Sequence, residues 1–97
     1  MWILTAGTGP DTMTFRLMPG SVKTLGRAQG ADLVVEAPLV SRVHCRLEAG
    51  KGALEVVDLS STNGTFVNDR RIERAKLATG DRLRVGRIEL AVSRGDH

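Results

Sequence analysis

The segment Cys45-Arg46-Leu47-Glu48-Ala49-Gly50-Lys51-Gly52-Ala53-Leu54-Glu55-Val56 decides the fold class of this chain. Apolar residues alternate with charged ones on both sides of its glycine-flanked lysine. Successive side chains of a β-strand point to opposite faces, so this alternation is typical of a half-buried strand. A short glycine-containing connection between two such runs predicts a β-hairpin.

The same period of two recurs outside this hairpin, at 13–17, 83–85 and 88–92. No window carries apolar residues at helical spacing over three turns. Turn signals separate the runs; they stand at Gly7-Thr8-Gly9-Pro10, Pro19-Gly20, Gly30, Asn63-Gly64, Asn68-Asp69, Gly80-Asp81 and Gly86. About ten short strands punctuated in this way predict an all-β sandwich or barrel.

The amino-acid composition limits the classes of function that this chain can have. The 97 residues fit one domain over 1–97, and 41% hydrophobic with 26% charged residues is ordinary globular composition. Eleven of the fourteen basic residues are arginine, whose planar fork suits phosphate or carboxylate. Aromatic residues are scarce, and Trp2, Phe15 and Phe66 read as core residues by their alternation. The stacking platform that a nucleic-acid-binding domain needs is therefore poorly supplied, and we expect no nucleic acid partner.

A single cysteine, Cys45, can form neither an internal disulfide nor a thiolate metal site. Its place in an alternating segment predicts a small core residue. The start of the chain lacks the pattern of a secretory signal, and no apolar run of about 18 residues could span a bilayer. We therefore expect a cytoplasmic protein with no cofactor and no membrane contact.

Three polar segments are longer than hairpin connections need to be; they span residues 26–32, 36–43 and 58–64. The side chains they supply are Arg27, Ser41, Arg42, Thr62 and Asn63. Arginine donates charge-assisted hydrogen bonds, short hydroxyls satisfy the remaining oxygens, and a carboxamide bonds a peptide main chain both ways. This inventory indicates a site for a dianionic phosphate attached to a peptide. Pro38-Leu39-Val40 offers either an apolar wall to that peptide or a buried strand entry.

The order of these motifs resembles the forkhead-associated (FHA) domain family. The motifs are Gly26-Arg27, Ser41-Arg42-Val43-His44 and Thr62-Asn63-Gly64-Thr65, followed by Leu77, Gly80-Asp81, Leu83 and Val85-Gly86. The match runs from about Leu25 to Gly86 without a departure at the motif positions. The resemblance implies a sandwich of two twisted, mostly antiparallel sheets with eleven strands and binding loops at one end. It also implies a non-catalytic module that binds a threonine-phosphorylated partner in kinase-linked signalling or assembly, often as part of a larger protein.

Carried over position by position, the resemblance implies a role for each motif residue. Phosphate would be bound by Arg27, Ser41 and Thr62, and either phosphate or peptide by Arg42. Asn63 would hold the peptide backbone, and the loop geometry would be supported by Gly26, His44 and Gly64.

The residues also allow other interpretations. Arg27 could be an ordinary surface arginine, Ser41 could merely cap a turn, and Thr65 could take the role given to Thr62. The residue types of a hydrolytic triad are present at Ser41, His44 and Asp58. Because no nucleophile-elbow glycines surround the serine, we expect no enzyme. The other histidine is His97, which leaves no histidine cluster for a metal.

Two other functions stay open as alternatives. One is an FHA-like scaffold that makes phosphate-independent protein contacts, and the other is a basic nucleic-acid-binding domain with a sequence pI near 9.8. The sequence does not specify the partner, the kinase, the peptide preference or the oligomeric state.

Overall fold

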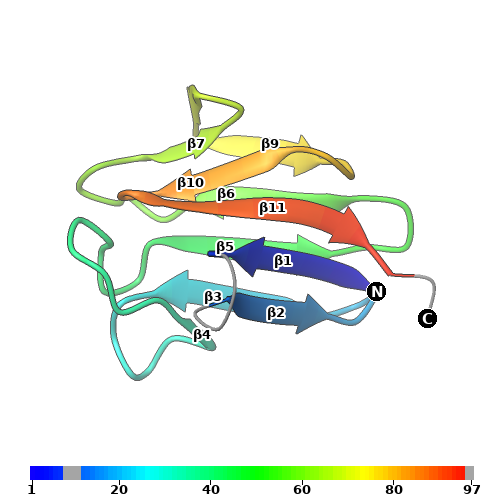
Figure 1. Cartoon of the computed structure of the whole chain (residues 1–97), viewed down its shortest axis with the longest axis horizontal. Coiled ribbons are helices and arrows are strands. Elements are labelled where there is room, and N and C mark those ends of the chain that lie inside the picture. The colour runs from blue at the N-terminus through cyan, green and yellow to red at the C-terminus, as the bar shows by residue number, and fades with distance from the viewer. Residues whose placement is uncertain (8–11, 96–97) are drawn as a thin grey trace.

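Figure 1 shows the chain as a computed structural model, which describes residues 1–7 and 12–95. The described residues form eleven strands and no helix, so the all-β prediction is confirmed. The strands are β1 (Trp2–Ala6), β2 (Met13–Leu17), β3 (Val22–Gly26), β4 (Leu33–Val34), β5 (Cys45–Ala49), β6 (Leu54–Asp58), β7 (Thr65–Val67), β8 (Arg70–Ile72), β9 (Arg74–Leu77), β10 (Arg82–Val85) and β11 (Ile88–Arg94). Most of the predicted turn at Gly7-Thr8-Gly9-Pro10, and His97, lie outside the described residues.

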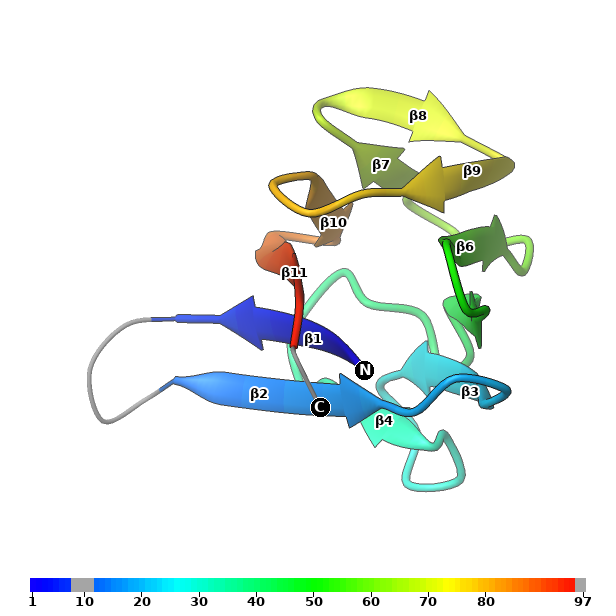
Figure 2. The same cartoon turned by 90° about the vertical axis from the view of Figure 1, so that its right-hand side faces the viewer.

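The strands form two sheets that face each other across the core (Figure 2). One sheet has the order β2-β1-β11-β10-β7-β8 and the other the order β4-β3-β5-β6-β9. Every pairing is antiparallel except β3 with β4. The predicted hairpin is β5–β6, with Cys45 opposite Asp58 and Ala49 opposite Leu54.

The core consists of the inward-facing residues of both sheets. Leu4, Leu47, Leu54 and Leu83 are completely buried, and burying one such side chain stabilises the fold by about 1.5–3 kcal/mol. Cys45 is completely buried, as its alternation predicted. Trp2 and Phe15 also pack in or against this core.

The prediction that Phe66 is a core residue was wrong. Phe66 lies on the outer face of β7, where the guanidinium of Arg84 stacks 4.2 Å from the centre of its ring. Its neighbour Thr65 takes the inward position and is completely buried. A polar residue can occupy that position because its hydroxyl donates to the carboxylate of Asp58.

The two ends of the sandwich differ in their connections (Figure 1). One end, here called the loop end, carries the long segments 27–32, 35–44 and 59–64. The other, here called the terminal end, carries the short turns 18–21, 50–53 and 78–81 and lies beside the start of β1 and the end of β11. Within the part of the chain that the structure describes, no helix is long and apolar enough to cross a membrane.

Candidate functional site

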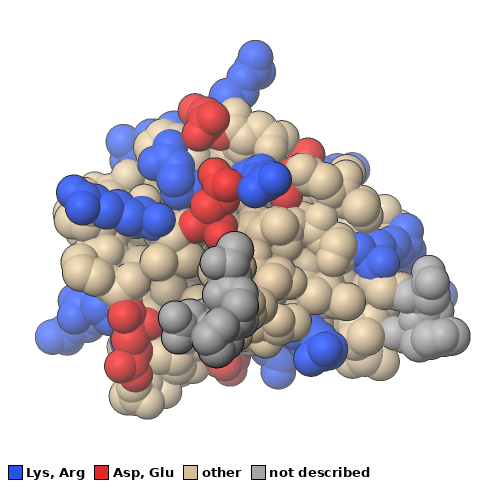
Figure 3. Space-filling model, viewed as in Figure 1, with Lys and Arg blue, Asp and Glu red and all other residues tan. Residues whose placement is uncertain are grey.

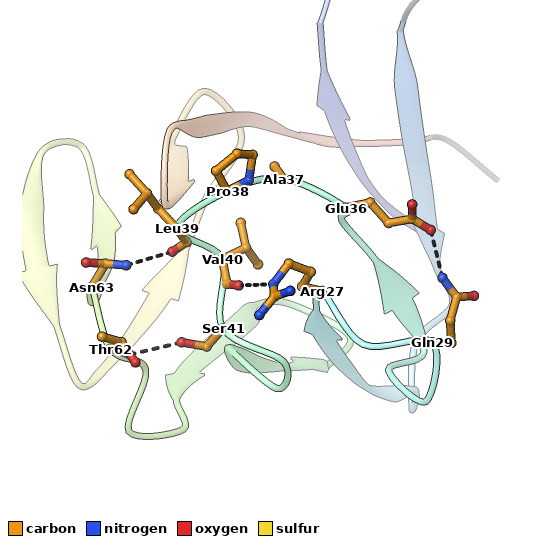
Figure 4. Close-up of a pocket in the computed structure, with 10 residues that line it drawn as sticks. All are labelled: Arg27, Gln29, Glu36, Ala37, Pro38, Leu39, Val40, Ser41, Thr62 and Asn63. Carbon is orange, nitrogen blue, oxygen red and sulfur yellow. Dashed lines mark hydrogen bonds between the residues drawn. The ribbon is translucent and has the colours of Figure 1, made fainter.

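A cleft of about 700 Å³ opens at the loop end (Figure 4). Its lining residues are Arg27, Gln29, Glu36, Ala37, Pro38, Leu39, Val40, Ser41, Thr62 and Asn63. Four of the five ligand-binding residues proposed from the sequence therefore meet here. They come from three separate loops, so the fold and not local sequence brings them together.

Arg27 directly follows β3 and is held in the cleft by the neighbouring segment 35–44. Its Nε donates to the carbonyl oxygen of Val40 at 3.0 Å, and its backbone N–H donates to the carbonyl of Ser41 at 2.9 Å. Its two terminal nitrogens form no hydrogen bond or ion pair with any residue that the structure describes. A guanidinium fixed through Nε keeps the outer edge of its fork open for a bidentate oxyanion.

Ser41 links two loops and keeps one hydrogen-bonding function free. Its Oγ accepts from the backbone N–H of Thr62 at 3.0 Å. A serine hydroxyl can donate once while it accepts, so the hydroxyl proton stays available to a ligand. The side chain of Thr62 is exposed on the same rim.

Asn63 lies at one side of the cleft and holds a strained piece of backbone. Its Nδ2 donates to the carbonyl oxygen of Leu39 at 3.0 Å. Leu39 has a φ of 72°, a conformation that bulky residues rarely adopt without compensating contacts. For the segment 38–40 the sequence left open an apolar wall or a buried strand entry; Pro38 and Leu39 are exposed at the cleft and Val40 is buried.

His44 is completely buried beneath the cleft and joins two of its loops. Its Nδ1 accepts from the backbone N–H of Ser41 at 3.0 Å, so in the neutral ring the proton lies on Nε2, which donates to the carbonyl of Gly64 at 2.8 Å. The imidazole forms its hydrogen bonds with backbone groups and not with the Ser41 hydroxyl, and the Asp58 carboxylate accepts from Ser61 and Thr65. These three residues therefore do not form a hydrolytic relay.

Asp58 organises the loop 59–64 from its base. Its carboxylate accepts from the backbone N–H and hydroxyl of Ser61 and from the hydroxyl of Thr65, and Ser61 Oγ in turn accepts from Gly64 N–H at 3.0 Å. Burial alone would raise the pKa of Asp58, but these hydrogen bonds outweigh it and hold the pKa below the ordinary value of 3.8. Because Thr65 is buried in this network, it cannot replace Thr62 at the cleft.

Two glycines allow the close approach of these loops. A Cβ on Gly26 would lie 2.0 Å from the carbonyl oxygen of Arg42, so only glycine fits beside the loop 35–44. Gly64 has a φ of 89°, which favours glycine, and a Cβ there would meet the side chain of Arg71.

The structure does not bring Arg42 into the cleft. Its side chain is exposed and its carbonyl accepts from the backbone N–H of Ala28 at 3.1 Å. The sequence reasoning missed Asp58 as the organiser of its loop, although Asp is a frequent turn residue whose side chain accepts from nearby backbone N–H groups. It also missed Gln29 and Glu36, for which no motif exists. Within residues 1–7 and 12–95, no three His, Cys, Asp or Glu side chains are placed to hold a metal ion.

Comparison with known proteins identifies relatives of this chain. The FHA domain family model matches residues 23–86. The chain is 41% identical over 86 residues to the ABC transporter ATP-binding/permease protein Rv1747 of Mycobacterium tuberculosis, covering 89% of this chain and 10% of that protein. It is 31% identical over 93 residues to the glycogen accumulation regulator GarA of Mycolicibacterium smegmatis, covering 96% of this chain and 59% of that protein. The chain thus spans only part of the length of these relatives.

A solved structure is similar over nearly the whole chain. It comes from a structural and functional analysis of phosphothreonine-dependent FHA domain interactions, with a TM-score of 0.88 and 31% identity. The similarity covers 99% of this chain and 98% of that chain. Both the sandwich and its loop end therefore have a counterpart in an experimental structure.

Proposed function

The chain belongs to the forkhead-associated (FHA) domain family, and on this premise we propose that it is a non-catalytic module that binds phosphothreonine in partner proteins. The observation that carries the proposal is the convergence of Arg27, Ser41 and Thr62 from three loops on one cleft. A phosphorylated side chain brings about −1.5 to −2 charges and three acceptor oxygens at neutral pH. An open guanidinium and two hydroxyls are the donors that such a group needs.

Each side chain has a distinct role in this proposal. Arg27 donates from its terminal nitrogens to two phosphate oxygens, and the hydroxyls of Ser41 and Thr62 donate to the oxygens that remain. Asn63 uses its unbonded amide functions on the main chain of the partner peptide. Arg42, exposed beside the cleft, adds long-range attraction for an anionic partner and makes no contact inside it.

The phosphothreonine ligand places the chain downstream of a Ser/Thr kinase in signalling or assembly. Because such kinases use ATP, we place the interaction in the cytoplasm. His44, Gly26 and Gly64 support the loops in this scheme, since their contacts are with backbone and not with the cleft. No step of chemistry is assigned to the cleft, because its serine has no hydrogen-bonded base.

The test is binding of a phosphothreonine peptide library beside its dephosphorylated copy, measured by fluorescence anisotropy. We expect the phosphorylated pool alone to bind, and Arg27→Ala to lower the affinity of a selected peptide at least about tenfold, because a charge-assisted hydrogen bond contributes about 1.5–3 kcal/mol. Lys51→Ala, which removes an exposed cation at the terminal end, is the matched control. Equal binding of both pools, or of wild type and Arg27→Ala, would contradict the proposal.

Peptide binding also distinguishes the proposed function from non-specific nucleic-acid binding. On the face shown in Figure 3, acidic and basic side chains are interspersed and form no continuous basic stripe. Non-specific DNA binding would weaken steeply with salt and would not distinguish the two peptide pools by competition. A phosphate-independent scaffold would bind both pools alike.

A further inference from the structure

One side of the cleft carries an acidic side chain. Figure 4 shows Asn63 and Thr62 at one side, Arg27 near the middle, and Glu36 with Gln29 at the far side. A carboxylate that lines a cleft built for an anion repels the ligand unless a cation of the ligand lies beside it. The position of Glu36 therefore bears on which charges the partner peptide carries near the phosphothreonine.

The carboxylate of Glu36 forms no ion pair with any residue that the structure describes. Its Oε1 accepts from Nε2 of Gln29 at 2.7 Å, and no arginine or lysine among the described residues pairs with it. On the sheets, by contrast, three glutamates lie against arginines; these pairs are Arg46–Glu48, Arg74–Glu55 and Arg82–Glu89. In a chain with eleven arginines, Glu36 is oriented by a neutral amide instead.

The contact with Gln29 also fixes where the charge points. Gln29 comes from the segment 27–32 and Glu36 from the segment 35–44, so the hydrogen bond joins two loops across the cleft wall. A carboxylate held in advance loses less conformational entropy when a ligand cation binds. One of its oxygens takes this bond, and no other bond to the carboxylate is found among the described residues, so the second oxygen can accept from a ligand.

We propose that Glu36, oriented by Gln29, selects phosphothreonine partners that carry a lysine or arginine on the side of the peptide that leaves the cleft away from Asn63. Because Glu36 and Arg27 line the same cleft, the cation lies within a few residues of the phosphothreonine, each of which advances an extended peptide by about 3.3 Å. Glu36 thus acts as a specificity-determining residue, and Gln29 as its positioning residue. This inference rests on the phosphothreonine-binding function proposed above.

The experiment uses the 97-residue chain and phosphothreonine peptides in an alanine background, with one lysine moved through each position on both sides. We expect wild type to prefer lysine over alanine about two- to fivefold at one or two neighbouring positions on one side, as for an exposed ion pair. The preference fades as salt is raised. Glu36→Gln removes it, Glu36→Lys turns it into a preference for glutamate, and Gln29→Ala weakens it.

Glu48→Gln is the matched control, because it changes the net charge equally near the far end of β5 and should leave the lysine preference intact. If Glu36→Gln tightens every phosphopeptide by the same factor, Glu36 merely repels phosphate and the inference is wrong, while the phosphothreonine function stands. If wild type binds no phosphopeptide of the set or of the library, the proposed function fails and the inference with it.

Discussion

The loop end and the terminal end satisfy their backbone donors and acceptors in different ways. At the terminal end, the turns contain short-range backbone bonds, such as Ser21 N–H to Met18 carbonyl at 3.0 Å and Gly50 N–H to Ala53 carbonyl at 2.8 Å. Two strand side chains, Trp2 and Arg94, also donate to carbonyls of the turn 50–53, but the short turns themselves present few side chains. At the loop end, side chains bridge segments that lie far apart in the sequence. Ser41 reaches the backbone of Thr62 and His44 reaches that of Gly64, over 21 and 20 residues.

The difference explains why one end can bind a ligand. A tight turn satisfies its own donors and acceptors and exposes little that a ligand could use. A long loop must be held by side chains, and a side chain that holds a loop with one atom can present another to the cleft. Ser41, Asn63 and Arg27 each do this. Substitutions should therefore affect the loop end strongly and the terminal end weakly.

The largest contrast is expected between two glycines. Gly26→Ala places a Cβ against the carbonyl of Arg42 and should lower the free energy of unfolding by about 3–5 kcal/mol, because backbone must shift. Gly52 at the terminal end has open space and no positive φ, so Gly52→Ala should be neutral or stabilise by up to about 1 kcal/mol. Urea unfolding of both variants measures the difference, and similar midpoints would break the comparison.

His44→Ala should have the next largest effect. It leaves the Ser41 N–H and the Gly64 carbonyl without their buried partner, which should cost about 2–4 kcal/mol of stability and also weaken phosphopeptide binding. The control is Asp81→Ala at the terminal end, which removes exposed hydrogen bonds and should cost less than about 1 kcal/mol without changing affinity. A His44→Ala variant that binds phosphopeptide as wild type does would show that the two loops hold their positions without this bridge.

Much of the fold could be predicted from the sequence because alternation reports which face of a strand is buried. The β5–β6 hairpin and the core position of Cys45 follow from alternation alone. Which residues of β7 face inward could not be predicted in this way. Thr65 faces inward because its hydroxyl donates to Asp58, and this contact joins strands of different sheets. A polar residue with a distant partner looks outward-facing in the sequence.

The residues of the candidate site also fall into those that the sequence could identify and those that it could not. The order of motifs pointed to Arg27, Ser41, Thr62 and Asn63, which line one cleft. Arg42 belongs to the same motif as Ser41, yet its side chain is exposed outside the cleft, because the backbone bends at residues 42–43 directly after Ser41. Glu36 could not be identified, since its meaning depends on a neighbour from another loop.

Asp58 offers a pH test of the loop end. Its pKa in the folded chain lies below 3.8, so its contribution to stability is complete above about pH 5 and is lost as the pH falls through the folded value. Asp58→Asn should lower stability by about 1–2 kcal/mol at neutral pH, since the amide replaces one acceptor by a donor. The gap between wild type and variant, followed by thermal unfolding, should shrink below about pH 4. A gap that widens on acidification would contradict this role.

The smallest effect separates binding from loop support at Ser41. Ser41→Ala removes the proposed phosphate donor and the acceptor for Thr62 N–H, and should lower phosphopeptide affinity about five- to tenfold with a stability loss of about 1 kcal/mol. Ser21→Ala at the terminal end should change neither. If Ser41 only caps a turn, its loss would lower the unfolding midpoint while the affinity of the folded protein for phosphorylated peptide stayed the same. The ratio of phosphorylated to unphosphorylated affinity therefore decides whether Ser41 donates to the ligand.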